Sequence, residues 1–224
     1  AAELQNVPCF VETFTLPQAD YAALLDAPGG YDKLYTNLVA AVKAGKARLD
    51  GCHLVVTHPG TRSVLDSTDE LIYPTEWTEA DLTGFQYPTA FEMHQLGDHF
   101  EFEPTLEEGS GALNVTQMFA RDRLQGLRLF KADSTLAGIP VTDMLVRQGT
   151  STCRVIAGVP TFLSTLKDEK AGDVTLVFAT MQLITLPAPK AAAHSGRGNL
   201  VLTARVISLD RMKGWELLKA HAME

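Results

Sequence analysis

The strongest constraint on the fold is a change of hydrophobic period near Gly45. From there on, short runs typical of strands recur between turn residues nearly to the C-terminus. Many short strands at close spacing favour a mainly β fold, and we predict an immunoglobulin-like β-sandwich. The run at 174–184 is apolar on both alternations, which predicts a central strand. The predicted strands span residues 8–16, 48–57, 62–65, 70–73, 90–95, 99–103, 113–122, 126–131, 144–148, 153–157, 174–186 and 200–209.

Helices are expected only near the two ends of the sequence. Two short ones, residues 18–27 and 31–44, form a helical insertion at about 18–44, and the second carries apolar residues on one face. A C-terminal helix is predicted at about 210–223, with Trp215 directed inward. The fold class is therefore a β-sandwich with two short N-terminal helices and a C-terminal helix.

Glycine and small residues mark the predicted turns. The segment 187–199 is expected to be an exposed loop that joins the last two strands. Glycines within the strand-rich region are expected at turns, where their backbone freedom is needed. These are Gly97, Gly109, Gly111, Gly149 and Gly158.

Length and charge narrow the classes of function. A chain of 224 residues with 46% hydrophobic residues can bury one sizeable core, so residues 1–224 are predicted to form a single β-rich domain. The net charge of −8 repels phosphate backbones, which argues against nucleic acid as a partner. No apolar run is long enough for a membrane-spanning helix, so the chain as given is not expected to be an integral membrane protein.

The stretch from Tyr87 to Leu106 contains the residues that most resemble a metal site. A strand would place His99, Glu101 and Glu103 on one face, and the neighbouring His94 and Asp98 could complete a set of ligands. Residues two apart on a strand lie ~6.5 Å apart, so ligands converge on one ion only with help from another strand. A solvated polar face needs no such help, and it is the interpretation we favour. No metal, cofactor or catalytic residue is predicted.

Two further groups of residues leave alternatives open. Cys9 and Cys52 lie in predicted strands and could form a disulfide in an extracytoplasmic chain; otherwise they and Cys153 are small buried side chains. Trp77 could line a carbohydrate groove, although an isolated tryptophan more often anchors a core. No phosphate-binding glycine loop is present in the sequence.

The order of several motifs resembles the C-terminal domain of secretins, the outer-membrane proteins of type II secretion and type IV pilus machines. In order, the motifs are "ARLDGCHLVVTHPG", "YPTEW", "PTAFE…LG…FEFEPTL", "GTSTCRVIAGV" and "DVTLVFATMQLI", and the resemblance covers residues 8–184. The family's double glycine and its V-P-x-L-G-x-I-P-like stretch survive only as traces in "IAGVPTFLSTLKDEKAG".

This resemblance implies a non-enzymatic, extracytoplasmic protein, periplasmic, outer-membrane associated or at the cell surface. It would act through protein–protein contacts with other pilus or secretin-system proteins, as a fimbria-type structural component. Sheet edges and the loop at 187–199 would carry such contacts. The alternatives are a metal-dependent hydrolase that uses the His94 to Glu103 cluster and a carbohydrate-binding module that uses Trp77.

Overall fold

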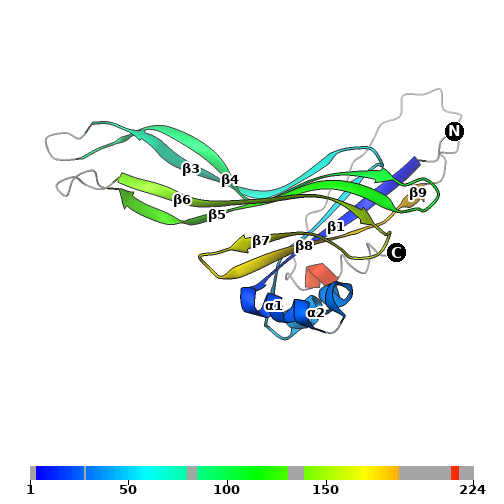
Figure 1. Ribbon diagram of the computed structural model, residues 1–224. Coiled ribbons are helices and arrows are strands. Elements are labelled where there is room, and N and C mark those ends of the chain that lie inside the picture. The colour runs from blue at the N-terminus through cyan, green and yellow to red at the C-terminus, as the bar shows by residue number, and fades with distance from the viewer. Residues whose placement is uncertain (1–3, 28, 80–84, 131–138, 187–212, 217–224) are drawn as a thin grey trace, which may run out of the picture.

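The computed structural model describes residues 4–27, 29–79, 85–130, 139–186 and 213–216. Two antiparallel sheets, two longer helices and one short helical segment make up the secondary structure of the described part (Figure 1), which confirms the mainly β fold class. Residues 213–216 are helical, and the rest of the predicted C-terminal helix lies outside the described residues. The elements are β1 (Leu4–Pro17), α1 (Gln18–Asp26), α2 (Gly30–Lys43), β2 (Arg48–Thr57), β3 (Ser63–Trp77), β4 (Pro88–Leu106), β5 (Leu113–Phe130), β6 (Ile139–Val155), β7 (Thr161–Asp168), β8 (Asp173–Met181) and β9 (Ile184–Leu186).

The first sheet has the order β2-β1-β8-β7, with β9 added to β1, and the second has the order β3-β4-β5-β6. The first sheet lies between the second sheet and the helices (Figure 1), so each of its faces covers a separate core. The buried strand β8 contributes to both cores, which explains why its sequence is apolar on both alternations. The prediction of a central strand here is confirmed.

The core between the sheets depends on the alternation predicted for β4. Phe100 and Phe102 are fully buried, and their rings stack with centroids 5.1 Å apart. His99 and Glu101 alternate with them and are only partly buried. The strand interpretation of this stretch is therefore right about which side chains point inward.

The core on the helical side encloses a polar contact. Glu12, in the middle of β1, is completely buried. The hydroxyl of Tyr35 on α2 lies 2.8 Å from Glu12 Oε2, and the indole N–H of Trp215 donates to Glu12 Oε1 at 2.5 Å. Burial raises the pKa of Tyr35, and the charge of Glu12 and its hydrogen bond raise it further. The predicted inward position of Trp215 is confirmed.

The second sheet has fewer and longer strands than the sequence predicts. The predicted strands 62–65 and 70–73 are parts of β3, and 90–95 and 99–103 are parts of β4. Gly97 and Gly149, predicted at turns, lie inside β4 and β6, so that prediction is wrong for these two. Strand β7 was not predicted, and the predicted loop 187–199 and strand 200–209 lie outside the described residues.

Gly97 is inside a strand because its position leaves no room for a side chain. Its φ is 140°, and a Cβ there would lie 2.2 Å from the carbonyl oxygen of Ser67 on β3. We expect Gly97→Ala to lower the free energy of unfolding by about 2–3 kcal/mol, measured by denaturant unfolding. Gly60→Ala is the control, since Gly60 has φ 74° but nothing within 4 Å of a Cβ, and should lower it by about 1 kcal/mol. Equal losses for the two variants would contradict the steric explanation.

Candidate functional site

The second sheet divides into two hairpins that extend beyond the first sheet (Figure 1). Strand β4 pairs with β5 only between Gly97 and Leu106, whereas β3–β4 and β5–β6 pairing continues beyond that point. We call the two extensions the distal hairpins: residues 68–77 with 88–96, and residues 123–130 with 139–147. In the described part of the chain, neither distal hairpin pairs with a further strand.

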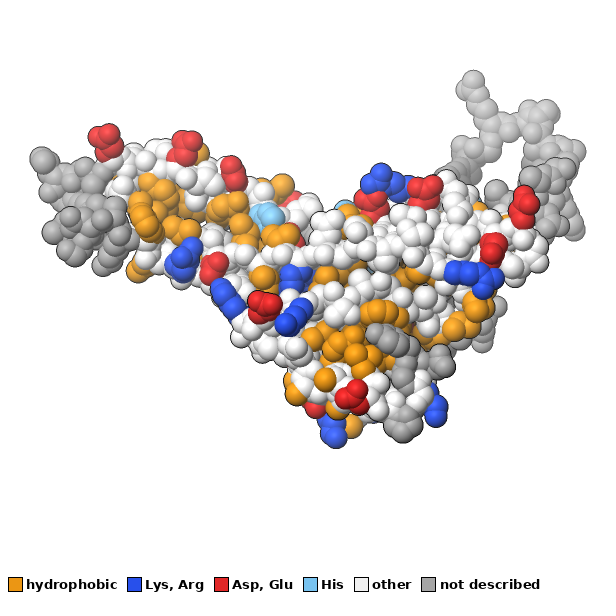
Figure 2. Space-filling model, viewed as in Figure 1, with side chains coloured by type: hydrophobic (Ala, Val, Ile, Leu, Met, Phe, Trp, Pro, Cys, Tyr) orange, Lys and Arg blue, Asp and Glu red, His pale blue; other side chains and the backbone are white. Residues whose placement is uncertain are grey.

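One face of the distal hairpins is apolar and exposed. Cross-strand partners share a face, so the register pair Ile72 and Met93 lies on the same side of the sheet. The cross-strand partners from β4 to β5 and from β5 to β6 show which residues of the second hairpin lie on this same side. Leu127 is 70% exposed and Leu129 is 69% exposed. We call this surface the apolar stripe; its exposed members are Ile72, Phe91, Met93, Leu124, Leu127, Leu129 and Val146. Figure 2 shows apolar side chains gathered along this extension.

The opposite face of the distal hairpins carries polar contacts. The Tyr73 hydroxyl donates to Glu92 at 3.3 Å, and Arg128 lies 4.0 Å from Asp143. This face is mixed in the second hairpin, because Phe130 lies on the same side as Arg128 and is 59% exposed.

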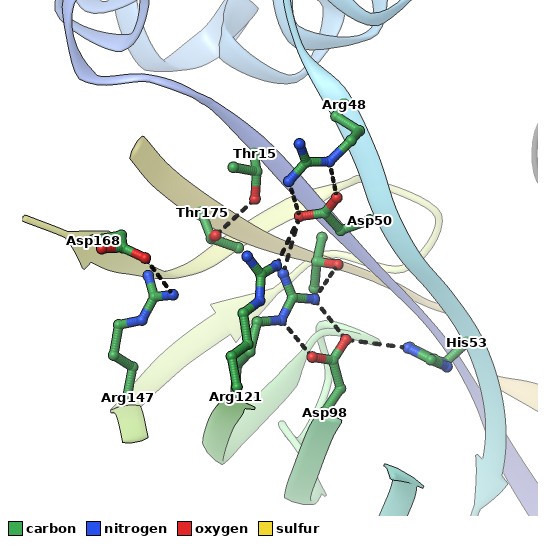
Figure 3. Close-up of polar contacts among 11 residues, drawn as sticks. Thr15, Arg48, Asp50, His53, Asp98, Arg121, Arg147, Asp168 and Thr175 are labelled. Atoms are coloured by element: carbon green, nitrogen blue, oxygen red, sulfur yellow. Dashed lines mark hydrogen bonds and ion pairs between the residues drawn. The ribbon is translucent and has the colours of Figure 1, made fainter. Parts of the chain in front are cut away.

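A buried charged cluster holds the two sheets together where the distal hairpins begin (Figure 3). Arg121 of β5 is 3% exposed and donates to both carboxylate oxygens of Asp98 on β4, at 2.5 and 2.6 Å. Its guanidinium also donates to Thr13 of β1 at 2.7 Å and to Asp50 of β2 at 3.3 Å. One arginine therefore contacts strands of both sheets, and such bidentate, charge-assisted bonds have a fixed geometry.

Two further arginines complete the cluster, which we call the charged root: Arg48, Asp50, Asp98, Arg121 and Arg123. Arg48 and Arg123 donate to Asp50 at 2.5 and 3.2 Å. His53 Nε2 lies 3.5 Å from Asp98, which is an electrostatic contact rather than a good hydrogen bond. A cleft of about 410 Å³ adjoins the root.

The charged root lowers the pKa values of its carboxyl groups. Burial alone would raise the pKa of Asp98, but His53 and the hydrogen bonds and charge of Arg121 outweigh it, so the pKa lies below its usual value. The pKa of Asp50 is also lowered, because Arg48 and Arg121 outweigh burial. Both carboxylates are therefore ionised at neutral pH.

A second ion pair joins the sheets beside the root. Arg147 of β6 donates to Asp168 of β7 at 3.3 Å (Figure 3). Burial lowers the pKa of Arg147, against the opposing effect of Asp168.

The structure separates the residues of the candidate metal site. His94 bonds Asp122 at 2.8 Å, His99 bonds Asp66, and Glu101 pairs with Arg62. Asp98 points inward to Arg121, on the other face from His99. Glu103 is exposed, on the face of β4 that points away from the first sheet. Among the described residues, no group of three or more His, Cys, Asp or Glu side chains is placed to hold a metal ion.

Of the two alternatives for Cys9 and Cys52, a disulfide or small buried side chains, the structure has both thiols free. The β1–β2 register places Cys52 opposite Glu12 and Cys9 opposite Val55. Cys9 lies in the core between the sheets, while Cys52 packs against the core on the helical side. Burial raises the pKa of Cys9, and its neighbour Cys153 raises it further.

The charged root was not predicted from the sequence. A signal was present, because Arg121 follows the buried Leu113, Val115, Gln117 and Phe119 at intervals of two along β5. An arginine at such an inward position needs buried carboxylate partners. Trp77, the candidate for carbohydrate binding, lies at the end of β3 and is half-buried.

No family model and no curated protein matches the chain. Several solved structures are similar to the chain. ExeD from Aeromonas hydrophila is 11% identical in sequence and has a TM-score of 0.42, with 82% of this chain aligned to 49% of that one. The type II secretin GspD from enteropathogenic Escherichia coli is 11% identical and also scores 0.42, with 82% aligned to 70%. The secretin InvG of the Salmonella SPI-1 type III secretion injectisome is 8% identical and scores 0.44, with 100% aligned to 72%.

The chain spans about half the length of ExeD. All three TM-scores are below 0.5, so no property of these secretins is assigned to the chain from them. Among the described residues, no helix is both long enough and apolar enough to cross a bilayer.

Proposed function

We propose that the chain is a non-enzymatic, extracytoplasmic component of a type IV pilus or secretin-like assembly, and that it works through protein–protein contacts made by the distal hairpins. The observation that carries this proposal is the apolar stripe, a row of large exposed side chains on one face of both hairpins.

The apolar stripe has the character of a contact surface. Single exposed apolar residues are ordinary, but several large exposed apolar side chains gathered on one face mark an interaction site. Two-stranded hairpins are also marginally stable in water, so each distal hairpin would gain stability from a partner. Leu127 and Leu129 are the most exposed members of the stripe, and covering each fully would contribute about 1.5–3 kcal/mol before the costs of association.

The edges of the second sheet offer a second means of attachment. In the described part of the chain, β3 pairs only with β4 and β6 pairs only with β5, so each leaves one edge unpaired. Unpaired edges accept strands from other chains. Contacts through the edges and the stripe together would fix both the position and the orientation of a partner.

Two features support the type of assembly and the non-enzymatic role. The motifs that resemble secretins include "YPTEW" and "PTAFE", which lie at the end of β3 and the start of β4 and so belong to the first distal hairpin. The histidines of β4 are held in contacts with acids of neighbouring strands, which supports a structural use of that cluster.

The test is crosslinking in the native cell envelope, followed by capture of the tagged full-length chain and identification of the crosslinked proteins. We expect pilus or secretion-system proteins, and we expect Leu127→Glu/Leu129→Glu to reduce their recovery about tenfold or more. The matched control is Leu54→Glu/Val56→Glu, which changes two exposed apolar residues of β2. Recovery of cytosolic enzymes alone, or equal losses in the two variants, would refute the proposal.

A further inference from the structure

We infer that the gap between the two distal hairpins is an acceptor site for one extended segment of a partner polypeptide. This inference rests on the proposed function and names the place and the form of the contact. We call the gap the fork; residues 88–96 of β4 border it on one side and residues 123–130 of β5 on the other.

The fork opens close to a shift of register in the second sheet. On β4 it begins at Gly97, whose φ is 140°. On β5 the register with β6 shifts between Leu124 and Gly126. A shift of this kind bends a strand and increases its twist, which favours separation of the two hairpins. The ring of His94 reaches Asp122 across the base of the fork at 2.8 Å.

Both borders of the fork are strand edges that, among the residues the structure describes, pair with another strand on one side only. Residues 88–96 pair with β3 and residues 123–130 pair with β6, but within the described residues these two borders do not pair with each other. On each border, alternate residues direct their N–H and C=O groups away from the strand with which they pair. An added polypeptide strand satisfies both rows of groups, whereas lipid tails satisfy neither.

The side chains along the fork define the partner segment. On the apolar stripe the borders present Phe91 and Met93 from β4 and Leu127 from β5. On the other face they present Glu92 and Arg128. A strand that fits between them alternates apolar and polar residues, with the apolar ones on the side of the stripe.

A hollow of about 390 Å³ at the base of the fork receives the end of such a strand. It opens on the face that carries the stripe, and its lining combines apolar and polar side chains. Met93, Met118 and Val146 supply the apolar part, and methionines adapt readily to different side chains.

The test uses a fluorescein-labelled ten-residue peptide of alternating valine and threonine or lysine, with the full-length chain. Hydrogen exchange should show slower exchange in residues 88–96 and 123–130 when the peptide is bound. The same peptide with N-methylated amides along one edge should not bind, because it can complete only one of the two rows of hydrogen bonds. Slower exchange confined to the outer edges of β3 and β6, or no binding of the peptide, would overturn the inference.

A matched pair of variants checks the position of the site. Met93 and Ile72 are register partners on the stripe, but only Met93 borders the fork. Met93→Lys should weaken peptide binding by about fivefold, and Ile72→Lys by less than about twofold, as measured by fluorescence anisotropy. Equal weakening would place the peptide elsewhere. Protection of the fork that increases with the concentration of the chain alone would assign the site to a second copy and overturn the inference.

The two proposals can fail separately. If envelope proteins are captured but the peptide does not protect the fork, the acceptor site is refuted and the proposed function remains. If the peptide protects the fork but no pilus or secretion-system protein is captured, the assembly is refuted and the acceptor site remains.

Discussion

Replacing Arg121 by leucine should lower the free energy of unfolding by about 3–5 kcal/mol, as measured by denaturant unfolding at pH 7. The variant leaves the buried Asp98 without its bidentate partner and removes one of the cations around Asp50. An unpaired buried carboxylate is much less favourable than one that is paired. Because Arg121 also contacts Thr13 of the other sheet, the two sheets should separate more easily.

Two comparisons isolate this effect. Arg128→Leu removes an exposed arginine that lies 4.0 Å from Asp143, and it should change stability by less than about 0.5 kcal/mol. Adding Asp98→Leu to Arg121→Leu should recover part of the loss, since no charge is then left unpaired at that position. A loss of under 1 kcal/mol for Arg121→Leu would mean that the charged root does not hold the sheets together.

The same variant should alter the response to acid. The pKa values of Asp98 and Asp50 are lowered in the folded chain, so both groups stabilise it above their unfolded pKa of about 3.9. This stability is lost as the pH falls through the lower, folded values. The difference in the free energy of unfolding between the native chain and Arg121→Leu should therefore become smaller as the pH is lowered from 7 to 3. A constant difference over this range would contradict the conclusion that Arg121 lowers the pKa values of these two carboxyl groups.

Trp215→Ala should also destabilise the chain by about 3–5 kcal/mol. The ring of Trp215 is 5% exposed and fills the core on the helical side, so its removal leaves a cavity. The variant also removes the indole donor from the completely buried carboxylate of Glu12. Trp215→Phe keeps an aromatic ring but removes the N–H donor. It should lower the free energy of unfolding by about 1–3 kcal/mol. Denaturant unfolding followed by circular dichroism gives both values.

Trp77→Ala is the matched control for this prediction. The sequence has two tryptophans, and Trp77 lies half-buried at the end of β3. Its removal should change the free energy of unfolding by less than about 1 kcal/mol. If Trp77→Ala and Trp215→Ala were equally destabilising, Trp215 would have no special role in the core.

Side-chain alternation was the most reliable guide from sequence to structure. It identified the buried face of β4, with Phe100 and Phe102, and the doubly buried strand β8. The prediction of turns at glycines was less reliable. Gly97 lies within β4, and a glycine is needed there because Ser67 of β3 leaves no room for a Cβ. The strands β4 and β6 were predicted as shorter pieces for this reason. Strand β7 was missed because its inward Leu163 and Leu166 are not two residues apart.

The candidate site was less predictable because it depends on which strands lie opposite each other. Alternation alone places Arg121 inward, but only the packing of the sheets brings Asp50 to it from β2. The two alternatives for Cys9 and Cys52 stayed open for the same reason, since the β1–β2 register decides which face each thiol occupies. A pattern within one strand contains no information on register between distant strands.

The position of β1 affects the order in which the molecule can fold. Strand β1 spans residues 4–17, yet it pairs on one side with β8, at residues 173–181, and Glu12 contacts Trp215. The β3-β4-β5-β6 sheet is built from neighbours in the sequence, so it can form early, while β1 completes its pairing only after β8, which comes later in the sequence, has been made. Until then the apolar faces of β1 are uncovered, and a nascent chain in this state would be a natural target for chaperones.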